Sequence, residues 1–407
     1  MKAIVLGGVA PHISLIERLK NRGFEVILID YLDDPPAKNF ADRFIQESTL
    51  DVDKVREIAQ AEQVDVIMTT NVDHANVTMC MVAEQLDLPH PYSLEVAQMT
   101  TNKALMKARM REGGIPTSPY FSVQSIDEIP WDDLTFPLVV KPADNNGSKG
   151  VKRVDDAESL RKGVLGAIEL SRSRTAIIEG FNEGREIQID CVANEGWAHI
   201  LTIREKLKIP RADGFAMQVY GSVVPAELPS ALIEEYHAIA QKIVDAFGLE
   251  HTPFFFQSIT DGTSVNVLEL SPRIGGGLSY KMIKDSVGVD VIEIAIDSYF
   301  GNIPQFSVEP AGVILASTIV YAKNGTFARL TGIDELKEDG TIVDWDQIAS
   351  TGTAFGSYMD SRNRVGAYYS SATDYAQLKA KTRKAEATMD VLDENGNSIK
   401  VSGLCYN

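Results

Sequence analysis

The sequence predicts a multidomain protein of mixed α/β and α+β class, built from three parts. Apolar strands alternate with amphipathic helices over residues 1–95, which predicts a doubly wound domain around a parallel sheet. Residues 96–305 mix helices with antiparallel hairpins and predict a second domain of α+β class. From residue 306 short alternating strands predict a small β-rich C-terminal module. At about 150 residues per domain, 407 residues suffice for this plan.

The first domain has the spacing of repeated strand–helix units. Gly7 and Gly8 follow its first strand, and Asp30 ends the second, which resembles a dinucleotide site with an acid about 20 residues after a glycine turn. The fingerprint G-x-G-x-x-G is absent because the run reads GGVAPH, so we expect a tight turn instead. The predicted elements are strand 2–6, helix 14–20, strand 24–30, helix 51–63 and strand 64–70.

The second domain begins with an amphipathic helix that follows Thr100 to Asn102 and ends at Gly113-Gly114. Two strands at its end, PFFFQSIT and SVNVLEL, flank the turn Asp261-Gly262. The elements between them are strand 136–142, glycine loop 144–150, helix 157–171, strand 175–181, the hairpin 185–192 with 197–203, and helix 230–247.

The last part reads as short strands separated by turns at Asn324-Gly325, Asp339-Gly340 and Asn395-Gly396. One helix, around residues 374–388, interrupts them. We therefore expect a mainly β module that packs closely on the rest of the chain, since no low-complexity linker precedes it.

Charge and cysteine content limit the partners. Lys plus Arg number 39 against 57 Asp plus Glu, a formal charge of −18, which argues against binding nucleic acid or anionic lipid. Three widely spaced cysteines suit a reducing compartment. No apolar stretch approaches the roughly 20 residues of a membrane span. We therefore expect a cytoplasmic protein without a membrane contact, in which any anion site gathers its cations locally.

Four features along residues 103–277 together predict a nucleoside triphosphate site. Lysines on two different elements can neutralise different phosphates, and a glycine loop lets backbone N–H groups approach them. A carboxylate and an amide at strand ends can hold Mg²⁺, which keeps substrate phosphates among its ligands. In chain order the features are Lys103 at a helix start; Lys141 before the loop 144–150; Glu179 with Glu186; and Gln257 with Glu269, before Ser271, Arg273 and Gly275 to Gly277.

The spacing leaves the partner of Glu269 open. A two-residue turn at Asp261-Gly262 would pair Glu269 with Phe254, whereas a five-residue connection would pair it with Gln257. Spacing alone therefore does not bring the metal pair together.

The segments TNKALMKARMREGGIP, FPLVVKPADNNGSKGV, IIEGFNEGREIQID and VLELSPRIGGG resemble the ATP-grasp superfamily, in its biotin carboxylase-like and carbamoyl phosphate synthase-like branch. The resemblance covers nearly the whole chain. It implies a pre-ATP-grasp domain over 1–95, an ATP-grasp domain of two α+β subdomains over 96–305 with a nucleotide-binding lid near 115–185, and a biotin carboxylase-like β-rich domain over 306–407.

The resemblance also implies a role for each matching residue. ATP and Mg²⁺, or Mn²⁺, would be the cofactors. Phosphates would meet Lys103, Lys141 and the loop residues Gly147, Ser148, Lys149 and Gly150. Glu179, Gly180 and Phe181 would hold adenine, and Glu186 the ribose. Gln257, Glu269 and Ser271 would bind the metal, while Arg273 stabilises the transferred phosphoryl group and Lys206 adds a cation near the γ-phosphate.

Two departures narrow the chemistry. The family's E-x-N metal motif is Glu269-Leu270-Ser271 here, which supplies a weaker ligand than an amide. The general-base Glu of biotin carboxylases is replaced by Gly277, and no M-K-M biotin site occurs, which disfavours carboxylation. We therefore predict an ATP-dependent carboxylate–amine ligase that forms an amide through an acyl phosphate, with small-molecule substrates and a homodimer as the candidate assembly. The alternatives are a non-catalytic ATP-binding module, another ATP-grasp chemistry such as bicarbonate activation, and a nicotinamide-dependent oxidoreductase.

Overall fold

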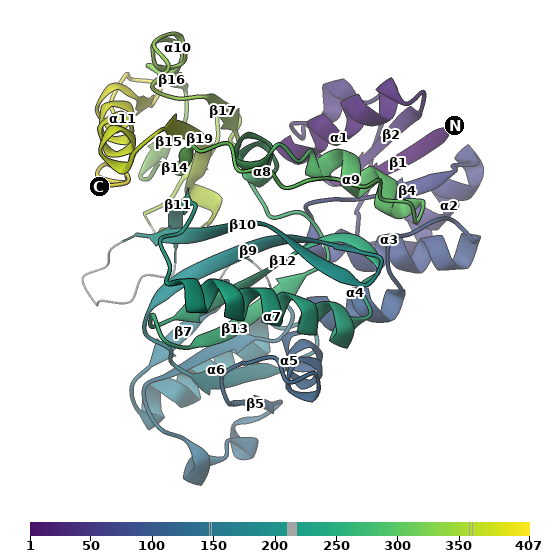
Figure 1. Cartoon of the computed structure of the whole chain (residues 1–407), viewed down its shortest axis with the longest axis vertical. Helices are drawn as coiled ribbons and strands as arrows, with labels where there is room; N and C mark the ends of the chain where they lie inside the picture. The colour runs from purple at the N-terminus through teal and green to yellow at the C-terminus, as the bar shows by residue number, and fades with distance from the viewer. Residues whose placement is uncertain (146, 148, 210–217, 358, 360) are drawn as a thin grey trace.

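The N-terminal part, coloured purple to blue in Figure 1, folds around a parallel sheet. The strand order of this sheet is β3-β2-β1-β4. The computed structural model describes residues 1–145, 147, 149–209, 218–357, 359 and 361–407. The predicted strands and helices of this part are confirmed, and the short, half-exposed edge strand β3 was missed because it has no apolar run. The elements are β1 Lys2–Leu6, α1 Ala10–Asn21, β2 Glu25–Asp30, η1 Lys38–Phe40, β3 Arg43–Gln46, α2 Val52–Glu62, β4 Val66–Met68 and α3 Asp73–Leu86.

The glycine turn after β1 is structural. The Asp30 carboxylate accepts hydrogen bonds from the backbone N–H groups of Gly8, at 2.6 Å, and Leu32, at 2.8 Å. A Cβ on Gly8 would lie 2.5 Å from Pro35, so only glycine fits. The oxygens that a dinucleotide ribose would need therefore hold the turn together, which argues against the oxidoreductase alternative.

Helix α5 (Lys103–Glu112) starts where the sequence predicts. Asn102 has an extended backbone conformation and separates α5 from the preceding helix α4 (Leu94–Thr101). The Asn102 side chain accepts hydrogen bonds from the N–H groups of Ala104 and Leu105, as an N-cap does. This cap places Lys103 at the first position of the helix.

A small antiparallel sheet, β5-β8-β6-β7, follows and packs with α6 around its own apolar core. We call it the four-stranded subdomain. Its elements are β5 Tyr120–Val123, η2 Ile126–Glu128, η3 Trp131–Asp133, β6 Leu138–Pro142, β7 Lys152–Val154, α6 Ala157–Leu170 and β8 Ala176–Gly180.

The central sheet has eight antiparallel strands in the order β13-β12-β9-β10-β11-β14-β19-β17. Its last three strands come from the C-terminal part, and the two parts join where β11 pairs with β14. The β-rich module therefore extends the central sheet, a continuity that no local pattern predicts. The elements are β9 Arg185–Asn194, β10 Trp197–Lys208, β11 Val219–Val224, α7 Ser230–Phe247, β12 His251–Thr260, β13 Val265–Ser271, β14 Ile314–Tyr321, β17 Asp344–Gln347 and β19 Arg364–Ala372.

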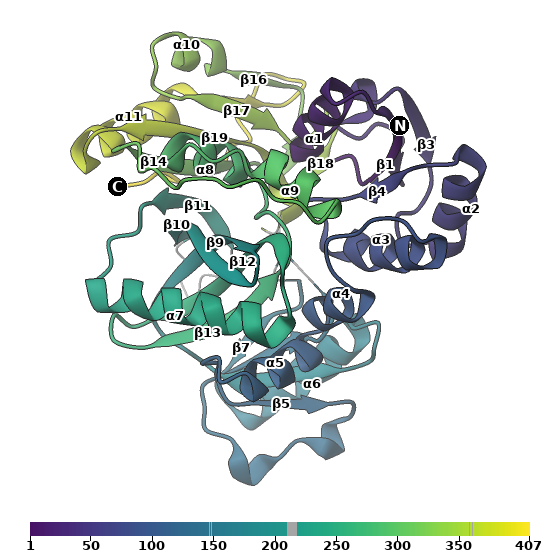
Figure 2. The ribbon, with the colours of Figure 1, turned by 45° about the vertical axis from the view of Figure 1, so that its right-hand side comes forward.

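One helix after β13, α9 (Val291–Tyr299), ties the central part back to the N-terminal domain. Figure 2 shows α9 beside α1, where Arg18 and Arg22 pair with acids of the α9 segment. The remaining elements are α8 Ser279–Val287, β15 Gly325–Thr326, β16 Arg329–Thr331, α10 Ile333–Glu338, β18 Ala354–Phe355, η4 Ser361–Asn363, α11 Tyr375–Thr388 and β20 Asp390–Leu392. Helix α11 confirms the predicted one, and the short α10 is additional. Within the described ranges, no helix has the length and apolarity to cross a membrane.

Candidate functional site

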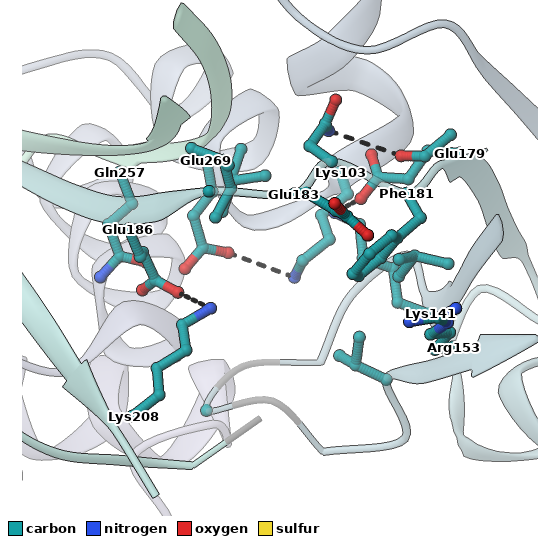
Figure 3. Close-up of a pocket in the computed structure, with 18 of the residues that line it drawn as sticks. Lys103, Lys141, Arg153, Glu179, Phe181, Glu183, Glu186, Lys208, Gln257 and Glu269 are labelled. Carbon is teal, nitrogen blue, oxygen red and sulfur yellow. Dashed lines mark hydrogen bonds and ion pairs between the residues drawn. The ribbon is translucent and has the colours of Figure 1, made fainter. Parts of the chain in front are cut away.

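A cavity of about 380 Å³ opens between the four-stranded subdomain and the central sheet (Figure 3). Its walls come from β6, β7 and β8 on one side and from β9, β10, β12 and β13 on the other. Most of the predicted nucleotide residues converge here, although the sequence separates them widely. The predicted residues that line it are Lys103, Lys141, Gly147, Glu179, Gly180, Phe181, Glu186, Gln257 and Glu269.

Glu179 is a buried carboxylate held between two lysines. Lys141 from β6 pairs with one of its oxygens, and Lys107 from α5 lies 2.8 Å from the other. Burial alone would raise the pKa of Glu179, but the charges of Lys141 and Lys107 hold it at about 2. Lys107 itself has a lowered pKa, because its burial outweighs its attraction to Glu179. The two ion pairs therefore outweigh the cost of burial, and the carboxylate of Glu179 stays ionised.

Lys103, at the start of α5, lies close to Glu269 on β13. Its Nζ lies 3.9 Å from the Glu269 carboxylate and donates a 2.5 Å hydrogen bond to the Asn145 carbonyl. Burial lowers the pKa of Lys103, and the nearby Glu269 partly opposes that effect. The lysine is therefore held at the junction of the glycine loop and β13.

The register of β12 and β13 settles the partner of Glu269. A four-residue turn pairs Thr260 with Val265, and the register then shifts beyond Ser258, where Leu268 forms a β-bulge. Without the bulge, Leu268 would stand opposite Gln257. The extra residue instead places Glu269 opposite Gln257, so the pairing that spacing left open is made by a bulge and not by a longer turn.

Gln257 and Glu269 together can supply two oxygens to Mg²⁺. Among the residues that the structure describes, no group of three or more His, Cys, Asp or Glu side chains could hold a metal alone. An amide and a carboxylate beside two lysine-lined walls nevertheless fit Mg²⁺, which takes few protein ligands when phosphates complete its shell. The residues present therefore fit a phosphate-bridged divalent cation.

Ser271 and Arg273, predicted as metal ligand and catalytic residue, do not line this cavity. The Ser271 hydroxyl donates to Asp73 Oδ1 at 3.0 Å, and Arg273 grips both oxygens of Asp73 at 2.5 and 2.6 Å. The Arg273 guanidinium also lies 5.0 Å from the Phe255 ring centroid. The hydroxyl of Ser271, which the sequence predicts as a metal ligand, is therefore hydrogen-bonded to Asp73 at the start of α3.

The predicted ribose acid, Glu186, is paired within the cavity. Lys208 at the end of β10 lies 2.7 Å from its carboxylate, an interaction the sequence reading missed. Lys206 lies two residues earlier on the same face of the strand but does not line the cavity. Burial, together with Arg204, lowers the pKa of Lys206 to about 8, against the pull of Glu186 and Asp190.

At the end of β8, the backbone N–H groups of Gly180 and Phe181 are already bonded. They donate to the carbonyls of Pro119 and Pro137, at 3.3 and 3.2 Å. Phe181 offers the cavity its ring, and the Arg153 guanidinium lies 4.7 Å from the ring centroid. Arg153, which was not predicted from the sequence as a site residue, therefore forms one flat wall of the cavity together with Phe181.

The glycine loop is only partly in the cavity wall. Gly147 lines it, whereas Lys149 and Gly150 do not, and Ser148 lies outside the described residues. Gly150 has φ of +77°, and a Cβ there would lie 2.7 Å from Leu170, so its glycine serves the packing of the loop base.

Comparisons with known proteins agree with this geometry. A model of the ATP-grasp domain matches residues 134–281, and one described as L-amino acid ligase C-terminal domain 2 matches residues 318–391. The L-arginine-specific L-amino acid ligase of Bacillus subtilis is 25% identical over 275 residues, which are 63% of this chain and 66% of that protein. The chain spans about half to two thirds of the length of such curated relatives.

Solved structures extend the similarity to the whole fold. The L-amino acid ligase from Bacillus licheniformis superposes with a TM-score of 0.80 at 21% identity, over 97% of this chain and 99% of that one. The biotin carboxylase domain of the Hydrogenobacter thermophilus 2-oxoglutarate carboxylase, solved with MgADP and bicarbonate, gives 0.77 at 17% identity, over 96% and 90%. The predicted fold class and family are confirmed. Residues 134–281 therefore form an ATP-grasp domain, residues 318–391 match a C-terminal domain of L-amino acid ligases, and the chain as a whole has the fold of ATP-grasp ligases.

Proposed function

We propose that this protein is a carboxylate–amine ligase that forms an amide through an acyl phosphate and releases ADP and phosphate. One observation carries the proposal: buried lysines from α5 and β6 and the Gln257–Glu269 pair enclose a single cavity. An L-amino acid is the carboxylate we favour, because residues 318–391 match a C-terminal domain of L-amino acid ligases and one similar protein is an L-arginine-specific L-amino acid ligase.

We assign the cavity to ATP. Lys103 and Lys141 neutralise its phosphates as compact charges, and the four-stranded subdomain forms the nucleotide-binding lid over residues 115–185. The purine lies against the wall of Phe181 and Arg153, next to the Glu179 carboxylate, and the ribose hydroxyls meet Glu186 beside Lys208.

Gln257 and Glu269 would hold Mg²⁺, with Mn²⁺ as a substitute. The bound ion would neutralise charge on the β- and γ-phosphates. Lys103, 3.9 Å from Glu269, adds a positive charge at the same place and keeps the carboxylate directed into the cavity.

The reaction then needs alignment and charge neutralisation, with no covalent enzyme intermediate. A carboxylate oxygen of the substrate attacks the γ-phosphorus, and the bond between that phosphorus and the β,γ-bridging oxygen breaks, which releases ADP. The amine nitrogen next attacks the acyl carbon, loses a proton and expels inorganic phosphate. We assign stabilisation of the transferred group to Arg273 and Lys206.

Phosphate release in the presence of ATP and Mg²⁺, measured over a panel of amino acids and other carboxylates with and without amines, tests the proposal. We expect ADP and phosphate only when a carboxylate and an amine are both supplied. ATP binding without turnover for every pair would favour the non-catalytic alternative. Turnover that requires bicarbonate would favour carboxylation.

We also propose a reducing, cytoplasmic setting. Cys80, Cys191 and Cys405 are free and buried, and none of them forms a disulfide.

A further inference from the structure

A row of polar side chains crosses four neighbouring strands beside the cavity. Glu269 on β13 stands opposite Gln257 on β12, which stands opposite Gln188 on β9, and Gln188 in turn faces Arg204 on β10. Gln257 lines the cavity, whereas Gln188 is 1% exposed and does not. Gln188 is therefore a buried neighbour of the metal pair without access to a ligand.

The hydrogen bonds along this row have one direction. Asp190 is ion-paired with Arg204 at 2.6 Å and, as a carboxylate, can only accept. Gln188 therefore turns its Nε2 toward Asp190, at 2.7 Å, and its Oε1 toward Gln257. Gln257 must then offer its Nε2 to Gln188, at 3.3 Å, which leaves its own Oε1 as the end available to the cavity.

This direction matters because Gln257 has two different ends. A carboxylate ligand presents oxygen whichever way it rotates, but an amide presents oxygen in one orientation and a non-ligating NH₂ in the other. Resting on the proposed function, in which Gln257 and Glu269 hold Mg²⁺, we propose that Gln188 is a positioning residue that keeps the Gln257 oxygen toward the metal. Asp190 fixes the orientation of the Gln188 amide, because it accepts a hydrogen bond from Gln188 Nε2.

The loop after β13 is shaped to leave room for this residue. A Cβ on Gly275 would lie 2.5 Å from Gln188 Nε2 and 3.0 Å from Arg204 Nη2. Glycine at this position therefore lets the loop pass directly over the amide that orients Gln257.

A double-mutant cycle on the full-length protein tests the proposal. The readout is the Mn²⁺ dissociation constant, measured by electron paramagnetic resonance in the presence of ADP. Gln188→Met should weaken Mn²⁺ binding by about 10- to 100-fold, the usual effect of removing a group that orients a metal ligand. In a Gln257→Glu background the same change should have no such cost, because a carboxylate needs no orientation.

Controls separate this proposal from the proposed function. Ser258→Ala changes the adjacent residue of β12, whose hydroxyl bonds to Tyr236 away from the cavity, and should leave Mn²⁺ affinity unchanged. Equal losses from Gln188→Met in both backgrounds would overturn the positioning role. No loss in the wild-type background, with Gln257→Met still weakening binding, would overturn it too. Unchanged Mn²⁺ affinity in Gln257→Met would instead overturn the metal site of the proposed function.

Discussion

Lys107 Nζ lies 2.8 Å from Glu179 Oε2, and the two side chains are 0% and 4% exposed. The pair joins α5 to β8, and Lys141 completes it from β6. Two members of this charged cluster, Lys141 and Glu179, line the cavity, and Lys107 lies behind them. The net charge of the cluster is positive, which suits a polyanion in a chain whose total charge is −18.

Replacing Lys107 should destabilise the protein. Lys107→Met removes one partner of a buried ion pair and leaves Glu179 with Lys141 alone, so we expect a loss of about 3 kcal/mol in the free energy of unfolding. Urea denaturation measures it. Lys162→Met is the matched control, because Lys162 forms an exposed pair with Glu158 and should matter by no more than about 0.5 kcal/mol. Equal effects of the two variants would contradict the buried pair.

Glu179 should also make stability fall in acid. Burial would raise its pKa, yet Lys141 and Lys107 hold it at about 2, below the ordinary 4.5. Because the folded-state pKa is depressed, the stabilisation from ionised Glu179 is complete above about pH 4.5 and is lost as the pH falls toward 2. Glu179→Gln, although less stable near neutral pH, should show a smaller decline across that window in urea denaturation. Identical declines would disprove the role of Glu179.

Removal of a charged side chain from the cavity should strongly reduce the rate of ADP formation. Lys141→Ala and Glu269→Ala should each lose at least about 100-fold in ADP formation, the scale of removing one charge-stabilising group. Steady-state assays of ADP release measure this, with Lys162→Ala as a surface control. Activity near wild type in either cavity variant would be incompatible with the assignment.

Asp73 should affect chemistry more than nucleotide binding. Asp73→Asn weakens the two hydrogen bonds that hold the Arg273 guanidinium, whereas Lys103 and Lys141 can still bind ATP. We therefore expect kcat to fall about 10- to 100-fold, with the KM for ATP little changed. Asp297→Asn, which loosens the α1–α9 contact through Arg22, is the control and should spare kcat. A change confined to the KM for ATP would contradict a role for Arg273 in the transfer step.

Much of the fold was predictable because its signals are local. Strand–helix alternation predicts the parallel sheet, and the order of Lys103, Lys141, Glu179 and Glu269 predicts a nucleotide site. The shared eight-stranded sheet was not predictable, because the pairing of β11 with β14 joins residues about 95 positions apart.

The missed features of the site have equally physical causes. Lys107 has the spacing of a surface lysine on a polar helix, and only tertiary packing buries it. The bulge at Leu268 has no glycine or proline signature, yet it decides which residue faces Gln257. Asp73 reaches Arg273 across 200 positions of sequence. Lys208, by contrast, could have been predicted, because it lies two residues after Lys206 and residues two apart in a strand point to the same face.

The acyl phosphate is the central claim, and isotope transfer tests it most directly. An amino acid that supports phosphate release in the substrate panel is labelled with ¹⁸O in its carboxylate, and inorganic phosphate is analysed by mass spectrometry. Attack on the γ-phosphorus predicts ADP and one labelled oxygen in the phosphate for each amide formed. Unlabelled phosphate, or the appearance of AMP and pyrophosphate, would contradict the account.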